Sequence, residues 1–227
     1  MQTLDRRTLL KAAAAAPAAG GLPWPGRARA QSANTIRLGV LADMSGMYRD
    51  VTGPTSVACT RLAAQEFAGH GFNVDVVFAD SQNRADIGVN IVRQWFDQGG
   101  VDAVVDVGAS SVALAVNEVV REKNKVMLNT SSATSDLTGK ACTPDTVHWT
   151  YDTYMLANSV GGATVRAGGD TWFLITADYA FGHALERDTS SFVRAQGGGS
   201  WAACGRPSRA PPTSPPSSCR RRPRGPR

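Results

Sequence analysis

Histidine and cysteine are scarce in this sequence, and the few it has are scattered. They are His70, His148, His183, Cys59, Cys142, Cys204 and Cys219. Their spacing matches no metal-ligand pattern. A Gly-x-Ser-x-Gly nucleophile elbow and a Gly-x-x-x-x-Gly-Lys-Ser/Thr phosphate loop are both absent. Without a base, a nucleophile and an orienting group in one pattern, we expect no cofactor, no metal and no enzymatic activity.

Acidic residues are absent from residues 198–227, where seven arginines gather. Residues 1–30 are also basic, with five cationic residues and one acid. The middle, residues 31–197, has 12 basic and 18 acidic residues, so its net charge is −6 although the whole chain carries +5. A nucleic-acid surface needs cations on the folded body, so the sequence argues against a nucleic-acid partner.

Proline is nearly absent from the middle of the chain. Of twelve prolines, three precede residue 26 and seven follow residue 206, which leaves Pro54 and Pro144. Since proline interrupts helices and strands, this distribution predicts one folded region between two ends without regular structure.

A long hydrophobic run is also missing. The N-terminal apolar run, residues 12–22, is too short to span a bilayer. It follows the pair Arg6-Arg7 and precedes Ala28-Arg29-Ala30, whose small residues are typical of a cleavage site. We predict that residues 1–30 are a cleaved twin-arginine signal peptide and that the mature protein is periplasmic. In that oxidising compartment Cys59 and Cys142 could pair, or they could be two separate buried thiols.

From residue 35 onward, short apolar segments rich in β-branched residues alternate with amphipathic segments. The first kind predicts strands at 36–42, 73–79, 101–107, 126–128, 147–150 and 171–176. The second kind predicts helices at 57–67, 87–96, 110–122, 152–167 and 181–195. This alternation predicts an α/β fold with a doubly wound, mostly parallel sheet.

Ligands of such sheets bind beyond the carboxyl ends of the strands, so the loops there are the candidate site. Residues 43–48 follow the first predicted strand, Gly108–Ser111 follow the third, and residues 129–136 follow the fourth. The last two loops are rich in hydroxyl groups and precede helices, where free N–H groups and the helix dipole favour an anion such as a carboxylate. Ordinary helix capping is the alternative explanation for the serines.

The order of several segments resembles that of type I periplasmic binding proteins that serve ABC importers of branched-chain amino acids. The segments are 36–48, 101–116, 124–139, 147–158 and 177–188. The resemblance implies a monomeric, two-lobed clamp that binds a small carboxylate ligand and delivers it to an ABC permease in the inner membrane. It divides the chain into an N-terminal ligand-binding lobe (31–150) and the start of a second lobe (151–197).

The resemblance also implies a set of ligand-binding residues. They are Tyr48, Ser110, Ser111, Ser131, Ser132, Ala133, Tyr154 and Tyr179. Interlobe packing is an alternative role for Tyr154. Amino-acid binders often have threonine where this chain has Ala133, so aromatic carboxylates or amides are an alternative ligand class. A sensory ligand-binding domain is an alternative use of the same fold.

The alternating pattern fails after Gly199. Residues 198–227 combine many prolines and arginines with no hydrophobic periodicity. A shift of reading frame, with suitable codons, converts parts of this segment into a strand and a capped helix. We therefore predict that 198–227 is a disordered, out-of-frame tail, and that the second lobe is truncated after one βα unit.

Overall fold

The computed structural model describes residues 34–206, and of residues 201–206 only the backbone. The predicted signal peptide, residues 1–30, and the chain beyond Arg206 lie outside the described residues. Among the helices of the described part, none has the length and apolar character needed to cross a membrane.

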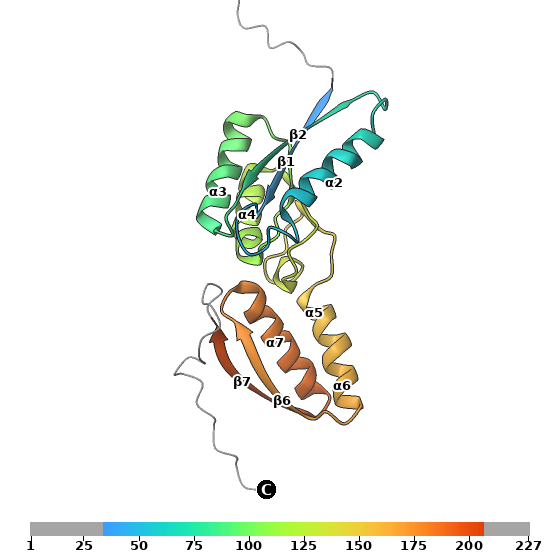
Figure 1. Cartoon of the computed structure of the whole chain (residues 1–227), viewed down its shortest axis with the longest axis vertical. Coiled ribbons are helices and arrows are strands. Elements are labelled where there is room, and N and C mark those ends of the chain that lie inside the picture. Colours follow the sequence, from blue (N-terminus) through green and yellow to red (C-terminus); the bar gives the residue numbers. More distant parts are fainter. Residues whose placement is uncertain (1–33, 207–227) are drawn as a thin grey trace, which may run out of the picture. The chain divides into compact units, whose positions relative to one another are not determined.

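A five-stranded parallel sheet forms the first half of the described chain (Figure 1). Its strands, in chain order, are β1 (Thr35–Ala42), β2 (Asn73–Asp80), β3 (Ala103–Asp106), β4 (Val126–Asn129) and β5 (Thr146–His148). Their order across the sheet is β2-β1-β3-β4-β5. All four residues of β3, in the centre, are buried, which matches the nearly continuous apolar sequence of a strand covered on both faces.

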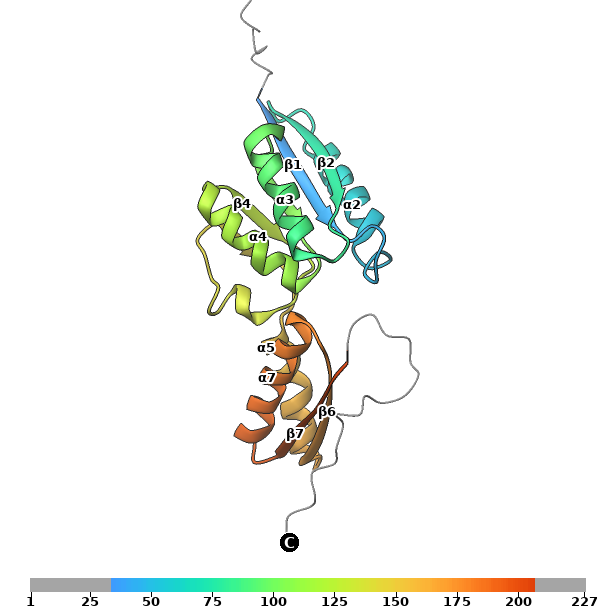
Figure 2. The ribbon, with the colours of Figure 1, turned by 90° about the vertical axis from the view of Figure 1, so that its left-hand side faces the viewer.

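Helices cover the two faces of this sheet unequally. They are α2 (Gly53–Glu66), α3 (Ala85–Gln94), which continues into a π-helical turn (Trp95–Gly99), and α4 (Ser110–Lys123). Neighbouring residues of a strand point to opposite faces. Accordingly, Leu41 of β1 packs with α3 and α4, whereas Val40 packs in a separate cluster with Val57 of α2. Figure 2 shows the helices α2, α3 and α4 around the strands of this sheet. The sheet is therefore doubly wound, as predicted, with two helices on one face and α2 on the other.

The strand order reverses direction between β1 and β3, and this switch point positions the candidate site. The register aligns Leu41, Asp106 and Asn129, the residues at or next to the carboxyl ends of β1, β3 and β4. The three loops that follow therefore start side by side at one edge of the sheet.

A second, two-stranded parallel sheet follows. It comprises β6 (Thr171–Ala177) and β7 (Gly199–Arg206), which are connected by α7 (Ala180–Ala195). The helical segment before β6 consists of α5 (Thr153–Leu156), a π-helical turn (Ala157–Gly161) and α6 (Gly162–Arg166). We predicted one helix over 152–167; its extent is confirmed, and the paired glycines 161 and 162 coincide with the change of helix type.

Strand β7 differs from the prediction that regular structure ends at residue 197. The segment pairs with β6 from Thr171↔Gly199 to Ala177↔Arg206, with one irregularity between Leu174 and Ile175. A strand presents backbone N–H and C=O groups along both of its edges, and this pairing satisfies those along one edge of β6. Residues 200–204 contain no proline or charge that would prevent it.

Both predictions for Cys59 and Cys142 are wrong, because the two thiols are free and exposed. Cys59 lies on α2. Cys142 follows a segment attached to α4, where Asn117 Nδ2 donates to the Ala141 carbonyl over 2.8 Å. The two cysteines therefore belong to opposite faces of the sheet, which prevents pairing.

Candidate functional site

The loop after β1 holds Tyr48 through a buried carboxylate. Asp43 accepts hydrogen bonds from the backbone N–H groups of Gly46, over 2.7 Å, and Tyr48, over 3.0 Å. A Cβ atom at Gly46 would lie 2.5 Å from an Asp43 carboxylate oxygen, so a side chain there would displace this contact. Asp80 of β2 anchors the same loop by accepting from Met44 N (2.9 Å) and Ser45 Oγ (2.6 Å). Tyr48 is thus presented by a loop fixed at both ends.

The chain turns sharply between β3 and α4. Asp106 and Val107 have φ angles of 77° and 57°, in the left-handed region that β-branched residues rarely adopt. Gly108 follows, and a Cβ there would lie 2.9 Å from the Thr52 side chain. Such backbone strain is maintained only where the surroundings over-determine it, and it often marks functional sites. Here it allows α4 to begin at Ser110, directly beyond the end of β3.

The N-terminus of α4 has no side-chain cap. Its N-cap residue is Ala109, and Ser110 and Ser111 lie in the first turn. The capping explanation therefore does not apply to these two serines. Ser110 is buried, and its hydroxyl accepts a hydrogen bond from Ser132 Oγ over 3.3 Å. Uncapped N–H groups and the positive end of the helix dipole make this terminus suited to an anion.

The loop after β4 brings Ser132 to this helix end. Ser132 N donates to Asn129 Oδ1 (3.0 Å), and the Ser132 carbonyl accepts from His148 Nε2 (2.6 Å). Asn129 Nδ2 donates in turn to the carbonyl of Val107 (3.3 Å), which joins the loops after β3 and β4. Ala133 is attached through its carbonyl, which accepts from Thr153 N over 2.8 Å. The structure thus brings the predicted residues Ser110 and Ser132 together.

The side chain of Ser131 does not take part in the contact between Ser110 and Ser132. Its hydroxyl donates to Asp106 Oδ1, which also accepts from Thr130 Oγ1 over 3.1 Å. Asp106, Thr130 and Ser131 line a groove of about 820 Å³ between α2 and its face of the sheet. The Ser131 hydroxyl is therefore on the groove side, apart from the Ser110–Ser132 pair.

Tyr179, the N-cap residue of α7, meets Tyr48. The two hydroxyl groups are hydrogen-bonded, and the ring centroids are 6.5 Å apart with an interplanar angle of 63°. Burial of Tyr48, followed by its hydrogen bond to Tyr179, raises the pKa of the Tyr48 hydroxyl well above its usual value. This hydroxyl therefore stays neutral and able to donate at physiological pH.

Tyr154 of α5 is 58% exposed, and its ring packs edge-on against Phe192 of α7, with centroids 4.9 Å apart. This contact joins two helices of the second lobe, so it is packing within that lobe; the predicted ligand-binding role of Tyr154 and its alternative, packing between the lobes, stay predictions.

Sequence reasoning missed three residues that hold these loops: Asp106, Asn129 and Thr153. Asp106 gave a signal, because it is a charged residue within the apolar run of β3. Asn129 and Thr153 gave none, because a buried amide and a buried hydroxyl look like ordinary loop and cap residues in a sequence.

We expect Asp106→Asn to stabilise the protein at neutral pH. Asp106 is 2% exposed, and its Oδ2 atom is buried without a hydrogen-bond partner among the described residues. Burial raises the pKa of this carboxyl above its usual value. The folded state then binds the proton more tightly than the unfolded state, so the contribution to stability is greatest below the unfolded pKa and is lost as pH rises through the folded pKa. Asparagine should add about 1 kcal/mol at pH 7 and little at pH 4.

The matched control is Asp80→Asn, which should have the opposite sign. Burial by itself would raise the Asp80 pKa, but hydrogen bonds from Ser45, Met44 and Gln82 outweigh it and lower the pKa. The stability from Asp80 is therefore present at neutral pH and lost as pH falls through the lowered pKa. Urea midpoints of both variants at pH 7 and pH 4 check this pair. Urea midpoints that shift by the same amount and in the same direction in both variants would refute the conclusion that ionised Asp106 destabilises the folded state.

These features define a class of protein: an α/β protein with an open parallel sheet and a candidate ligand site at its switch point. The sequence matches the family model described as periplasmic binding protein over residues 35–215, most of the chain. The chain therefore belongs to this family, and the resemblance to its type I members is confirmed. The prediction of a binding protein in place of an enzyme is confirmed at the level of the family. The match also extends past residue 197, where we expected family-like sequence to end.

Solved structures agree with this assignment. A periplasmic binding protein from Burkholderia mallei is 42% identical, with a TM-score of 0.75 over 78% of this chain and 48% of that one. A branched-chain amino acid ABC transporter periplasmic ligand-binding protein from Burkholderia xenovorans LB400 is 34% identical, with a TM-score of 0.66 over 77% of this chain and 47% of that one.

A solute-binding protein of an ABC transporter from R. palustris, in complex with 4-hydroxybenzoate, is 20% identical and shares the fold, with a TM-score of 0.69 over 78% of this chain and 48% of that one. The chain thus spans about half the length of these relatives. No curated protein matches it.

Proposed function

We propose that this chain carries the N-terminal ligand-binding part of a periplasmic solute-binding protein of an ABC importer, and that its ligand is a small carboxylate. The observation that carries the proposal is the meeting of Ser110 and Ser132 at the uncapped N-terminus of α4. Two hydroxyl donors and free backbone N–H groups at one helix end suit a carboxylate group. Tyr48 and Tyr179, whose hydroxyl groups are hydrogen-bonded to each other, supply an aromatic wall.

Two ligand classes fit this site. The 34%-identical relative from Burkholderia xenovorans belongs to a branched-chain amino acid transporter, which supports an aliphatic amino acid. Ala133 at a position where amino-acid binders often carry threonine supports an aromatic carboxylate or an amide. The paired tyrosines also favour a flat, aromatic ligand, because aromatic rings pack well against one another.

The test uses a chimera: residues 31–197 of this chain, followed by the matching second part of the Burkholderia mallei relative. Calorimetry would compare leucine, valine, benzoate and 4-hydroxybenzoate with the amide of each. We expect at least one carboxylate to bind with a Kd of about 1 μM and its amide to bind at least about 100-fold more weakly, because the amide lacks the charge. Equal affinity for acid and amide would support the amide alternative. Failure of every carboxylate would contradict the proposal.

Export is the second part of the proposed function. We propose that residues 1–30 direct the protein through the twin-arginine route to the periplasm, where the form with a complete second lobe serves a permease in the inner membrane as a monomer. Changing Arg6 and Arg7 to lysine should leave uncleaved precursor in the cytoplasm, since lysine keeps the charge but not the paired-arginine motif. Fractionation and immunoblotting check this. Unchanged periplasmic yield would contradict the twin-arginine assignment.

The frameshift stays a prediction, and the gene sequence across codons 190–230 tests it. A sensory role on the same fold would be favoured if deletion of the gene left ligand uptake intact while altering a ligand-dependent response.

A further inference from the structure

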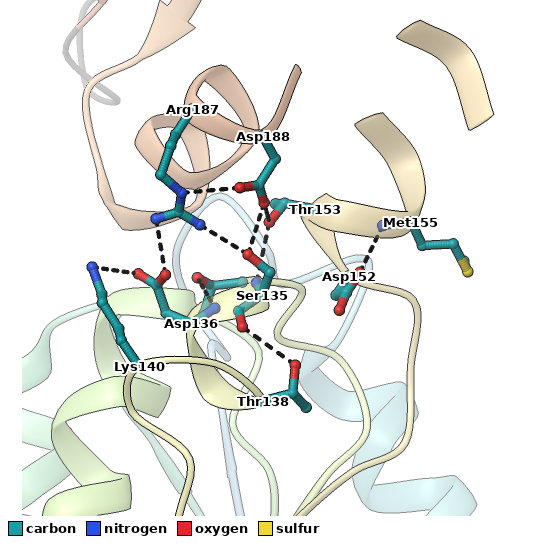
Figure 3. Close-up of polar contacts among 10 residues, drawn as sticks. Ser135, Asp136, Thr138, Lys140, Asp152, Thr153, Met155, Arg187 and Asp188 are labelled. Atoms are coloured by element: carbon teal, nitrogen blue, oxygen red, sulfur yellow. Dashed lines mark hydrogen bonds and ion pairs between the residues drawn. The ribbon is translucent and has the colours of Figure 1, made fainter. Parts of the chain in front are cut away.

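A polar cluster connects α7 to the segment that follows the β4 loop (Figure 3). Arg187 lies at its centre. Its guanidinium contacts Asp136 Oδ1 through Nη1 (2.9 Å), donates to Ser135 Oγ through Nη2 (2.9 Å) and to Asp188 Oδ1 through Nε (2.9 Å). Lys140 adds a second cation, 3.0 Å from the other Asp136 oxygen. The single side chain of Arg187 thus connects α7 to two consecutive residues of this segment, Ser135 and Asp136.

Asp188 and Thr153 form the buried side of the cluster. Asp188 Oδ2 accepts from Ser135 Oγ (2.7 Å) and from Thr153 Oγ1 (2.6 Å). Thr153 Oγ1 also accepts from Ser135 N (3.1 Å), so its hydroxyl both donates and accepts. Thr153 is fully buried and Asp188 is 8% exposed. Buried polar groups with such directed partners specify one local conformation.

The cluster is continuous with the loop that carries Ser132 and Ala133. Thr153 N donates to the Ala133 carbonyl over 2.8 Å, and Ser135, two residues further on, is held by Thr153 and Asp188. Thr153 therefore holds the loop through two hydrogen bonds, one from its backbone N–H and one to its hydroxyl group. Neither contact reaches the groove side, where Ser131 meets Asp106.

The charges of the cluster are arranged to keep Asp188 ionised. Burial alone would raise the Asp188 pKa, but hydrogen bonds from Thr153 and Ser135, together with Arg187, outweigh it and lower the pKa. The Arg187 pKa is raised, first by its hydrogen bond to Asp188. An ionised Asp188 is acceptor-only, which fixes the direction of the hydrogen bonds from Thr153 and Ser135.

We propose that Thr153 and Asp188 are positioning residues that fix the loop 131–135, and with it the ligand-facing Ser132 and Ala133, while Arg187 locks the cluster from the solvent side. The inference rests on the proposed function only in assuming that the loop 131–135 contacts the ligand. Loop order is measured without ligand, so failure of this inference and failure of the proposed function are distinguishable.

The test is hydrogen exchange of the full chain, read at the amides of Ser135 and Thr153. Thr153→Val keeps the shape of the side chain and removes its hydroxyl, whereas Thr153→Ser keeps the hydroxyl and removes a methyl group. We expect exchange at both amides to rise about 10- to 100-fold in the valine variant, as for loss of a hydrogen bond to a charged group. The serine variant should stay within a few-fold of the wild type. A role in packing alone predicts the reverse order, and that result would overturn the proposal.

Asp188→Asn and Arg187→Gln extend the test along the cluster. Both should raise exchange at the same amides while exchange in β3 stays unchanged. Glu186→Gln, which removes one negative charge as Asp188→Asn does but two residues earlier on α7, should have no effect. If Asp188→Asn unfolds the chain, the more exposed Arg187 still decides the question. Unchanged exchange at Ser135 and Thr153 in Arg187→Gln and Thr153→Val would overturn the proposal.

Discussion

Replacing Ser132 with alanine in the chimera should weaken binding of its carboxylate ligand by about 1–3 kcal/mol, which is about a 5- to 150-fold loss of affinity. The reason is the loss of a hydroxyl donor to a charged group in a fully buried position. Ser110→Ala should have a similar effect. The double variant should lose less binding free energy than the two single variants lose together, because the two hydroxyl groups contact each other and act as one unit. Calorimetry measures all three.

Ser131→Ala is the matched control for this series. It removes the same atom from the neighbouring residue, but that hydroxyl contacts Asp106 on the groove side. We expect affinity within about 0.5 kcal/mol of the wild type, together with some loss of stability. Equal losses of affinity in Ser131→Ala and Ser132→Ala would contradict the assignment of the anion site to the Ser110–Ser132 pair.

The chain as it stands should bind an apolar dye strongly and should self-associate. Two apolar surfaces are uncovered among the described residues. One is the groove beside α2, where Ile36 is 42% and Phe67 is 56% exposed. The other is the outer face of β6, where Phe173 is 61% and Ile175 is 73% exposed. Monomeric proteins rarely expose contiguous apolar patches larger than a few hundred Å².

The chimera provides the comparison, because it adds the remaining length of a family member. Dye fluorescence should be several-fold higher for the chain alone, and sedimentation should show oligomers of the chain alone and a monomeric chimera. Urea unfolding of the chain alone should be broad with a low slope, since less surface is buried and a two-stranded sheet is marginal by itself. Changing Phe173 and Ile175 to threonine should lower dye binding and association together. A monomeric chain with weak dye binding and a sharp transition would show that its sheets need no further cover.

The positions of the elements could be predicted from the sequence because the signals there are local. Apolar runs such as that of β3 and periodic segments such as α4 depend on the burial of their own side chains. Helix α2 begins earlier than predicted, at Gly53, because Pro54 is tolerated in a first helical turn. Strand β7 was missed because its pairing with β6, rather than its own pattern, makes it a strand.

The site was harder to predict than the fold, for a physical reason. Serine residues in a loop look alike in sequence, yet Ser132 turns toward α4 and Ser131 toward Asp106. That difference comes from the backbone after β4, which is fixed by Asn129 at the end of β4 and by Thr153 of α5. Side-chain direction in a loop depends on such distant partners, and one sequence does not reveal them.

The most direct test of the account is the location of the ligand. Amide chemical shifts of the labelled chimera would be recorded with and without the carboxylate that binds best in calorimetry. We predict that the largest changes fall on Ser110, Ser111, Ser132 and Ala133, and that residues along the groove beside α2, such as Thr55 and Ala63, do not change. Large changes along α2 with unchanged shifts at the serine loops would contradict the claim that the ligand binds at the switch point of the sheet.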